Sequence, residues 1–178
     1  AAEWKWDGIR VQLILGKGKV SLFSRTGDDI AGAFPDLVDN VFGEAVLDGE
    51  LLVGHDLEPA LFNDLQQRLN RKKPSAALVL SNPAHVRLYD ALIIGNEDLR
   101  PLPLRERRQR LEAWFAERQR PRFDLSPLIQ FADWSALARL RADARSAGIE
   151  GLMLKRWSAP YGPGRPGSPR VDSGRRLY

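Results

Sequence analysis

Charged and aromatic residues alternate near the start of the chain, in the segment EWKWDGIR at residues 3–10. Side chains two positions apart share a face of an extended backbone, so Glu3, Lys5 and Asp7 lie on one face and the two tryptophans on the other. A lysine between two carboxylates is either part of a surface ion pair or a reactive lysine. Lysine attacks only as the neutral amine, which neighbouring carboxylates disfavour. The reactive alternative therefore requires another cation, such as a metal on a nucleotide phosphate.

The elements that must position this segment are short strands and amphipathic helices. Hydrophobic alternation predicts strands at 9–15, 20–25, 45–53 and 150–156, and two strands within 77–94 that break at Asn82-Pro83. Helical spacing predicts helices at 35–41, 59–69 and 102–117, and a helix from Asp133 or Ser135 to about Ala147. Because hairpins are interspersed with helices without βαβ alternation, we expect an α+β fold of antiparallel sheets with a ligand cleft between them.

Three local details bear on a site. Gly49 lies inside a predicted strand, which indicates a bulge or a close backbone approach. In the helix at 102–117, the apolar side chains are expected to face inward and the arginines of RERRQR to face solvent. In a regular strand over 150–156, Glu150 and Lys155 lie on opposite faces, so both reach one cleft only if the strand twists or bulges.

Composition narrows the function classes. The 178 residues are 43% hydrophobic, include no cysteine, and contain no apolar run near the roughly 20 residues of a membrane span. Disulfides and thiol catalysis are excluded, and we expect a cytoplasmic protein with no membrane partner. Residues 1–99 carry a net charge of −5 and residues 100–178 a net charge of +9. The basic half suggests a phosphate-bearing partner or simply a solvated helix face.

Five segments together resemble the ordered motifs of ATP-dependent DNA ligases. EWKWDGIR resembles their nucleophile motif, Glu-x-Lys-x-Asp-Gly-x-Arg, and FSRTGDD, LDGELLV, RLYDAL and EGLMLKR resemble the motifs that follow, over residues 3–156. LFNDLQQRL and PLRERRQRL resemble the connecting segments. One such motif arises easily by chance, whereas five in order at plausible spacing do not. The chain is thus identified as similar to the adenylation domain of this family, and we expect a bacterial source.

The resemblance implies a nucleotidyltransferase (ATP-grasp-like) fold and a three-step reaction. Lys5 would attack the α-phosphate of ATP, release pyrophosphate and retain AMP. AMP would pass to the 5′-phosphate of nicked double-stranded DNA, and the 3′-hydroxyl would displace it. The implied cofactors are ATP and Mg²⁺ or another divalent metal. The implied processes are DNA replication, repair and recombination. The protein is expected to be a monomer.

The resemblance also assigns the residues that bind the nucleotide. Glu3 would accept a hydrogen bond from the adenine amino group, and Tyr89 would stack on adenine. Arg10 and Arg25 would reach ribose or phosphate oxygens, because a guanidinium is always charged and binds two oxygens at once.

The metal and the reacting phosphate would be held by acids and a second lysine. Glu150 would bind a divalent ion, and Glu50 would bind the ribose or the same ion. Lys155 would neutralise charge that develops on the α-phosphate. His55 and His85 stand alone, and we expect no catalytic role for either.

The chain departs from the family pattern after Lys155. No lysine follows it, although the family's last nucleotide-binding motif is lysine-rich, and Arg175 and Arg176 do not replace lysines aimed at a phosphate. We therefore expect an adenylation domain at 1–157 and a Gly/Pro/Arg-rich tail at 158–178, with the oligonucleotide-binding and DNA-binding domains missing. Self-adenylation would be weak, and nick sealing by this chain alone is not expected.

Two other functions fit part of the pattern. An RNA ligase or an mRNA-capping guanylyltransferase uses the same lysine chemistry, although the two connecting segments favour a DNA ligase. A non-catalytic module that binds nucleic acid through the basic half would show salt-dependent DNA binding and no covalent nucleotide.

Overall fold

A large, mainly antiparallel sheet forms the centre of the molecule. The structure, a computed structural model, describes residues 1–16, 18–38, 43–118, 120–144 and 149–162. The strands β2 (Ile9–Gly16), β3 (Lys19–Ser24), β4 (Ala45–Val53), β5 (Ala84–Ile94) and β6 (Glu97–Asp98) pair in the order β3-β2-β4-β5-β6. A short strand, β7 (Phe123–Leu125), pairs in parallel with β5. The predicted hairpin and the α+β antiparallel class are confirmed, with β7 as the parallel exception.

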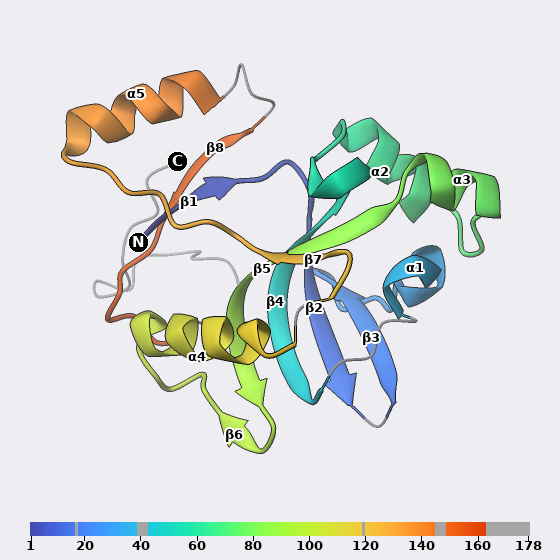
Figure 1. The fold of residues 1–178 in the computed structure, drawn as a ribbon, viewed down its shortest axis with the longest axis horizontal. Helices are drawn as coiled ribbons and strands as arrows, with labels where there is room; N and C mark the ends of the chain where they lie inside the picture. The colour runs from blue at the N-terminus through green and yellow to red at the C-terminus, as the bar shows by residue number, and fades with distance from the viewer. Residues whose placement is uncertain (17, 39–42, 119, 145–148, 163–178) are drawn as a thin grey trace.

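A second, smaller sheet lies beside the first (Figure 1). It consists of β1 (Ala2–Lys5) and β8 (Gly151–Leu154), which pair antiparallel although they are far apart in the sequence. Helix α5 (Trp134–Ala144) covers one face, where a small core forms around Ala2, Leu137 and Leu152. The opposite face is left for polar residues, and this face carries the site.

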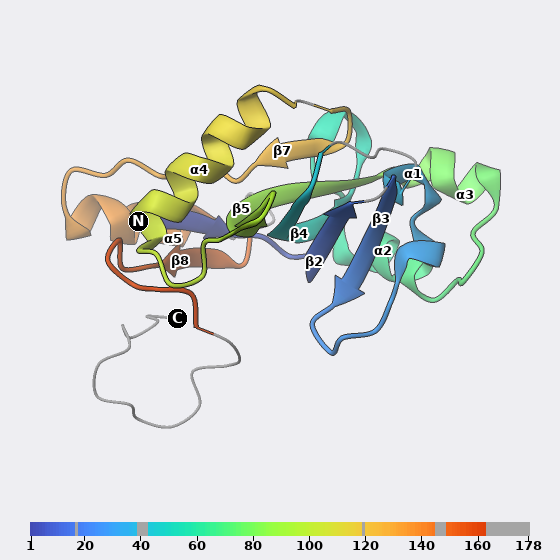
Figure 2. The same cartoon turned by 90° about the horizontal axis from the view of Figure 1, so that it is seen from below.

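The main core occupies one face of the large sheet. Alternate residues of β2, β4 and β5 enter it and meet helices α1 (Pro35–Val38), α2 (Phe62–Leu69) and α4 (Leu104–Ala116), with two short 3₁₀ turns at Ala31–Ala33 and His55–Leu57. Seen from below, α4 lies along one side of the sheet (Figure 2). Because side chains alternate along a strand, the opposite face of β2 and β4 presents the intervening polar residues.

One predicted strand is a helix. Residues 77–81 belong to α3 (Ala76–Ser81), whose amino end is capped by the Ser75 hydroxyl, an acceptor for the amide of Leu78. An N-cap serine satisfies an amide that a helix would otherwise leave unpaired. This cap favours a helix here, although the apolar residues alone predict a strand. The predicted cap at Asp133 is confirmed by its bond to the amide of Ala136, whereas the expected end of that helix near Ala147 lies outside the described residues.

The expected solvent face of α4 is partly wrong. Arg107 and Arg108 are buried, at 3% and 5% exposure, while Leu104, Leu111, Trp114 and Phe115 face inward as predicted. Arg107 forms two hydrogen bonds of 2.8 Å with the carboxylate of Asp90. A buried arginine is tolerated when such a partner compensates its lost hydration. No helix that the structure describes is long and apolar enough to cross a membrane.

Candidate functional site

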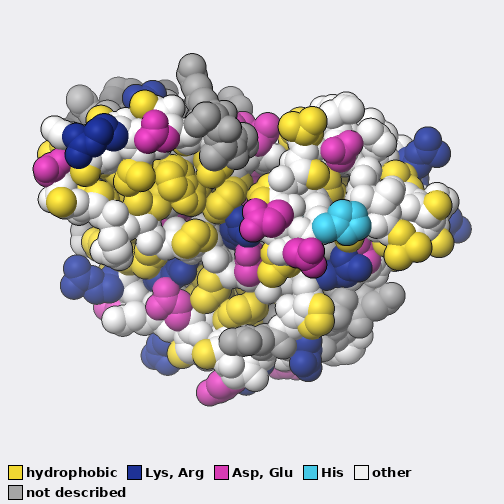
Figure 3. Space-filling view, turned by 45° about the horizontal axis from the view of Figure 1, so that its top comes forward, with side chains coloured by type: hydrophobic (Ala, Val, Ile, Leu, Met, Phe, Trp, Pro, Cys, Tyr) yellow, Lys and Arg dark blue, Asp and Glu magenta, His cyan; other side chains and the backbone are white. Residues whose placement is uncertain are grey.

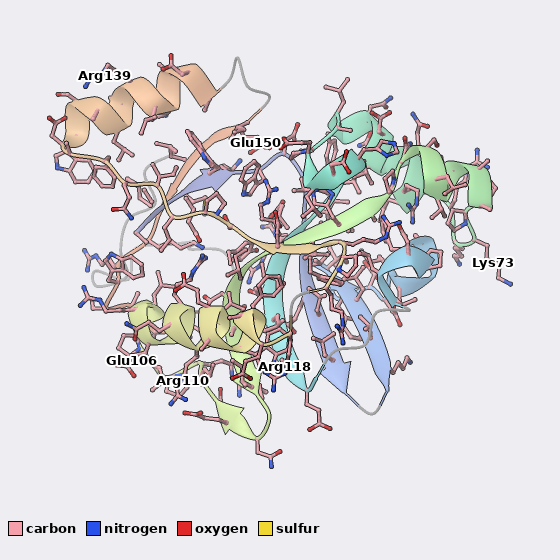
Figure 4. The ribbon with its side chains drawn as sticks, in the orientation of Figure 1. Lys73, Glu106, Arg110, Arg118, Arg139 and Glu150 are labelled. Atoms are coloured by element: carbon pink, nitrogen blue, oxygen red, sulfur yellow. The ribbon has the colours of Figure 1, made fainter. Side chains whose placement is uncertain are left out.

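Two ion pairs cross the polar face of the small sheet. In its register, Lys5 lies opposite Gly151 and Glu3 opposite Met153, and Lys155 continues the ladder opposite the first residue of the chain. Lys5 pairs with Glu150, and Lys155 pairs with Glu3. One face therefore gathers four of the side chains that the sequence singled out, those of Glu3, Lys5, Glu150 and Lys155. Figure 4 labels Glu150 next to the connection that follows β1.

A backbone twist at Gly151 reconciles Glu150 with Lys155. Gly151 has a φ of +150°, a conformation that residues with a Cβ rarely adopt. The amide of Glu150 still donates to the carbonyl of Lys5, at 3.0 Å, so the ladder continues past the twist. The strand therefore has the irregularity that the sequence required. Because of it, Glu150 lies on the same face as Lys5, which it would not do in a regular strand.

Glu3 is deeply buried and held from two sides. It is 3% exposed and pairs with Lys155 and, more loosely at 3.4 Å, with the guanidinium of Arg108 from α4. Arg108 also donates to the carbonyl of Ser126 at 2.9 Å and to Glu112. Sequence reasoning missed Arg108 because its partner lies 105 positions away, and helical charge patterning carries no signal for such a contact.

The large sheet contributes Glu50 and Tyr89. Burial raises the pKa of Glu50 to about 7, although the charges of Arg10 and Lys5 act in the opposite direction. Burial, followed by the charge of Glu50, raises the pKa of Tyr89, whose ring lies 4.5 Å from the ammonium of Lys155. Lys155 therefore links the two sheets across the site.

The irregular pairing of β4 with β5 positions these two side chains. A register shift beside Gly49 inserts Tyr89 as an extra residue in β5, and bulges of this kind redirect a side chain. A Cβ on Gly49 would lie 2.6 Å from Val86 and 3.0 Å from the carbonyl of Arg87. Both consequences predicted for this glycine, a bulge and a close approach, are confirmed.

Arg10 belongs to a network that the sequence did not reveal. Its Nη2 donates to Asp48 at 2.5 Å and to the hydroxyl of Tyr161 at 2.7 Å, and Tyr161 donates to the same carboxylate oxygen at 2.9 Å. Asp48 also accepts a bond from Gln12 at 3.2 Å. Asp48 could have been found from the sequence, because it lies two residues before Glu50 on one strand and so shares its face. No sequence pattern pointed to Tyr161.

Arg25 is not drawn into this cluster. It follows the last residue of β3, is exposed, and forms no ion pair or hydrogen bond with any residue in the described ranges. Ser24 pairs with Val11, so Arg25 comes next to Arg10 only in the extension of that register. Its predicted contact with a nucleotide stays a prediction.

Glu50 and Glu150 are the carboxylates that could hold a divalent cation together with a ligand. Both carboxylates act on Lys5, one through an ion pair and one through its charge. No group of three or more metal-ligating side chains occurs in the described part of the chain. A pair of carboxylates, rather than a complete cage, suits Mg²⁺, which keeps waters and phosphate oxygens as its other ligands.

One face of the molecule carries a group of charged side chains. Acidic and basic side chains gather near the middle of the face in Figure 3, beside an apolar region over the small sheet. Two hollows, of about 350 and 310 Å³, open elsewhere, and none of the predicted site residues lines either. The expected cleft between the sheets remains a prediction.

Comparison with known proteins supplies a family. A family profile described as "ATP dependent DNA ligase domain" matches residues 1–169. "DNA ligase 2" of Haloquadratum walsbyi is 36% identical in an alignment 172 positions long, which covers 94% of this chain and 27% of that protein. The "Probable DNA ligase" of Koribacter versatilis is 33% identical in a gapped alignment 199 positions long, which covers 98% of this chain and 34% of that protein. The chain thus spans about a third of the length of these curated relatives.

Solved structures share the fold. A "mycobacterial DNA ligase D complexed with ATP and MES" superposes with a TM-score of 0.72 at 26% identity and covers 93% of this chain and 50% of that one. The ligase domain of M. tuberculosis LigD superposes with a TM-score of 0.70 at 24% identity, with 93% and 51% coverage.

Proposed function

The chain belongs to the ATP-dependent DNA ligase domain family, and from this premise we propose that it carries out the adenylation step with Lys5 as the nucleophile. The observation that carries the proposal is the single polar face on which Lys5, Glu150, Glu3 and Lys155 lie together. Lys5 is the lysine of the segment that resembles the nucleophile motif, and its side chain is 39% exposed.

The reaction at Lys5 forms one bond and breaks another. The Lys5 ammonium first loses a proton to solvent, and its neutral Nζ then attacks the α-phosphorus of ATP. The bond from that phosphorus to the bridging oxygen breaks, pyrophosphate leaves with the electron pair, and the nitrogen loses a second proton to solvent. Before the nucleotide arrives, Lys5 forms an ion pair with Glu150. Glu150 and Glu50 would hold a divalent ion, which when bound supplies positive charge beside Lys5 and the phosphates.

The remaining residues would bind and orient the nucleotide. Glu3 would read the adenine amino group, and Tyr89 would stack on the base, which requires Lys155 to move from the ring toward the phosphate. Arg10 would bind ribose or phosphate oxygens, and Arg25 would join it if its exposed side chain turns inward. A mycobacterial relative was solved with ATP, which supports ATP as the ligand here.

The later steps require the rest of the protein. We propose that AMP passes from Lys5 to the 5′-phosphate of nicked DNA and that the basic half, residues 100–178, contributes to DNA binding. The relatives are named DNA ligases, which supports DNA rather than RNA as the substrate. The domain boundary at 157, a monomeric state and a cytoplasmic location are part of the same proposal. A bacterial source is supported by Koribacter versatilis, although most of the relatives are archaeal.

A labelling experiment tests the adenylation step. The chain is incubated with α-labelled ATP and Mg²⁺ and is then run on a denaturing gel beside Lys5→Ala. The matched control is Lys19→Ala, which removes an exposed lysine from β3. We expect label on the wild type and on Lys19→Ala alone. Label on Lys5→Ala at the wild-type level would refute the assignment.

A further inference from the structure

The segment that follows β8 caps helix α4. Residues 156–162, here called the return segment, run from the small sheet back to the start of α4 (Figure 1). The amides of Leu104 and Arg105 donate to the carbonyls of Ala159 and Trp157, at 2.8 and 3.0 Å. No side chain caps α4, whose N-cap position is Pro103, so the return segment satisfies amides that the helix leaves unpaired. The return segment is therefore fixed to the start of α4 by its backbone.

This docking delivers one side chain to the site. The amide of Tyr161 donates to the carbonyl of Arg100 at 2.9 Å, which fixes the backbone at that point. The Tyr161 hydroxyl accepts from Arg10 and donates to Asp48, and Arg10 also donates to Asp48. The three groups form a closed ring of hydrogen bonds between the return segment and the large sheet.

The ring holds one corner of the Arg10 guanidinium. Both of its bonds use Nη2, and a guanidinium has five N–H donors, so others remain for a ligand. Asp48 is 1% exposed and Arg10 38% exposed, so the ring is anchored at its buried end and open at the arginine. Arginine has many rotamers, and two fixed partners on one nitrogen restrict them.

We propose that Tyr161 is a positioning residue for Arg10. The Tyr161 hydroxyl holds the Arg10 guanidinium in place to bind the ribose or phosphate oxygens of ATP. This inference rests on the proposed nucleotide contact of Arg10. Burial and the neighbouring Asp48 raise the pKa of Tyr161 to about 12, so the hydroxyl keeps its proton and stays a donor throughout the neutral range.

The test is Tyr161→Phe, which removes the hydroxyl and keeps the ring. We expect the Kd for ATP, measured by calorimetry without a divalent metal, to rise about fivefold, as for the loss of a hydrogen bond that organises a charged donor. The thermal midpoint stays within a few degrees. The matched control is Trp157→Phe. It changes the ring whose centroid lies 5.9 Å from the guanidinium carbon of Arg105, but it keeps the backbone carbonyl of residue 157 that caps α4. We expect its Kd for ATP to equal the wild-type value.

A double variant separates positioning from general stability. On an Arg10→Gln background, adding Tyr161→Phe leaves the Kd unchanged within twofold, because the group that Tyr161 positions is gone. A further fivefold loss there, or an unchanged Kd in Tyr161→Phe alone, would overturn the inference. If Arg10→Gln does not fold, the single variant decides. A wild type that does not bind ATP would overturn the proposed function as well, so the two failures are distinguishable.

Discussion

Glu50 combines a high pKa with a position beside the proposed nucleophile. Its pKa of about 7 arises mainly from burial, which disfavours the charged carboxylate. At neutral pH a large share of the molecules therefore carries a protonated Glu50. Metal ligation requires the ionised form, so any affinity of this residue for a divalent ion rises as the pH passes through 7.

The same shift predicts a pH dependence of stability. Between the usual glutamate pKa and about 7, the folded state binds the extra proton, so the stabilising contribution of Glu50 is complete at low pH and is lost as the pH rises through about 7. We expect the stability difference between the wild type and Glu50→Gln to shift against the wild type over this range. Urea unfolding of both chains at pH 5 and pH 8 measures it. An equal difference at both pH values would contradict the shift.

His85 predicts the opposite trend. It is 1% exposed, neither ring nitrogen has a hydrogen-bond partner among the described residues, and burial with the charges of Arg87 and Arg122 lowers its pKa to about 4. Below its ordinary pKa of 6.5 the unfolded state takes up a proton that the folded state refuses, so stability is lost as the pH falls.

The variant His85→Leu tests this assignment. It fills the site with an apolar side chain and removes the titration, so stability at pH 7 should be unchanged or higher. Between pH 6.5 and 4, the wild type should lose up to about 1.4 kcal/mol more per pH unit than His85→Leu. Parallel pH profiles for the two chains would show that His85 titrates normally.

At the scale of the elements, the small sheet depends on the twist at Gly151. A Cβ there meets no atom within 4 Å, so the cost of a side chain comes from the backbone conformation alone. We expect Gly151→Ala to destabilise the chain by roughly 1–3 kcal/mol and to slow adenylation about tenfold, since Glu150 moves away from Lys5.

The control for this prediction is Gly16→Ala at the end of β2. Gly16 is not among the glycines with positive φ, and a Cβ added there would meet no atom within 4 Å. The substitution should therefore change the free energy of unfolding by less than about 1 kcal/mol. Thermal unfolding and a single-turnover labelling rate measure both variants. A Gly151→Ala chain with the wild-type labelling rate would show that the twist does not serve the site.

Sequence reasoning predicted the elements better than their contacts. The alternation in 9–15 and 45–53 gave strands β2 and β4 because one face of each is buried in the core. The same reasoning failed for α3, where a serine cap determined the structure.

The site itself was only partly predictable from sequence. Motif order identified Lys5, Glu150 and Lys155, whereas the twist that unites them was recognised only as a requirement. Arg108 and Tyr161 were missed because each acts on a residue more than 100 positions away, and a single sequence carries no record of such pairs.

At the scale of the whole molecule, segments from the beginning and the end of the described chain pack against each other. Its first strand pairs with β8, and the return segment brings the following residues back onto α4 and into the site. The fold is shared with a ligase D structure at only 26% identity, so the architecture tolerates wide sequence change. About two thirds of the length of the curated relatives lies outside the matched region.

The most direct test of the central claim is to locate the adenylate. The chain is incubated with ATP and Mg²⁺, digested, and its peptides are examined by mass spectrometry for the added mass of one AMP. We predict the adduct on the peptide that contains Lys5, at the lysine nitrogen, and none on the peptide that contains Lys155. An adduct on Lys155 or any other lysine, with Lys5 unmodified, would contradict the account.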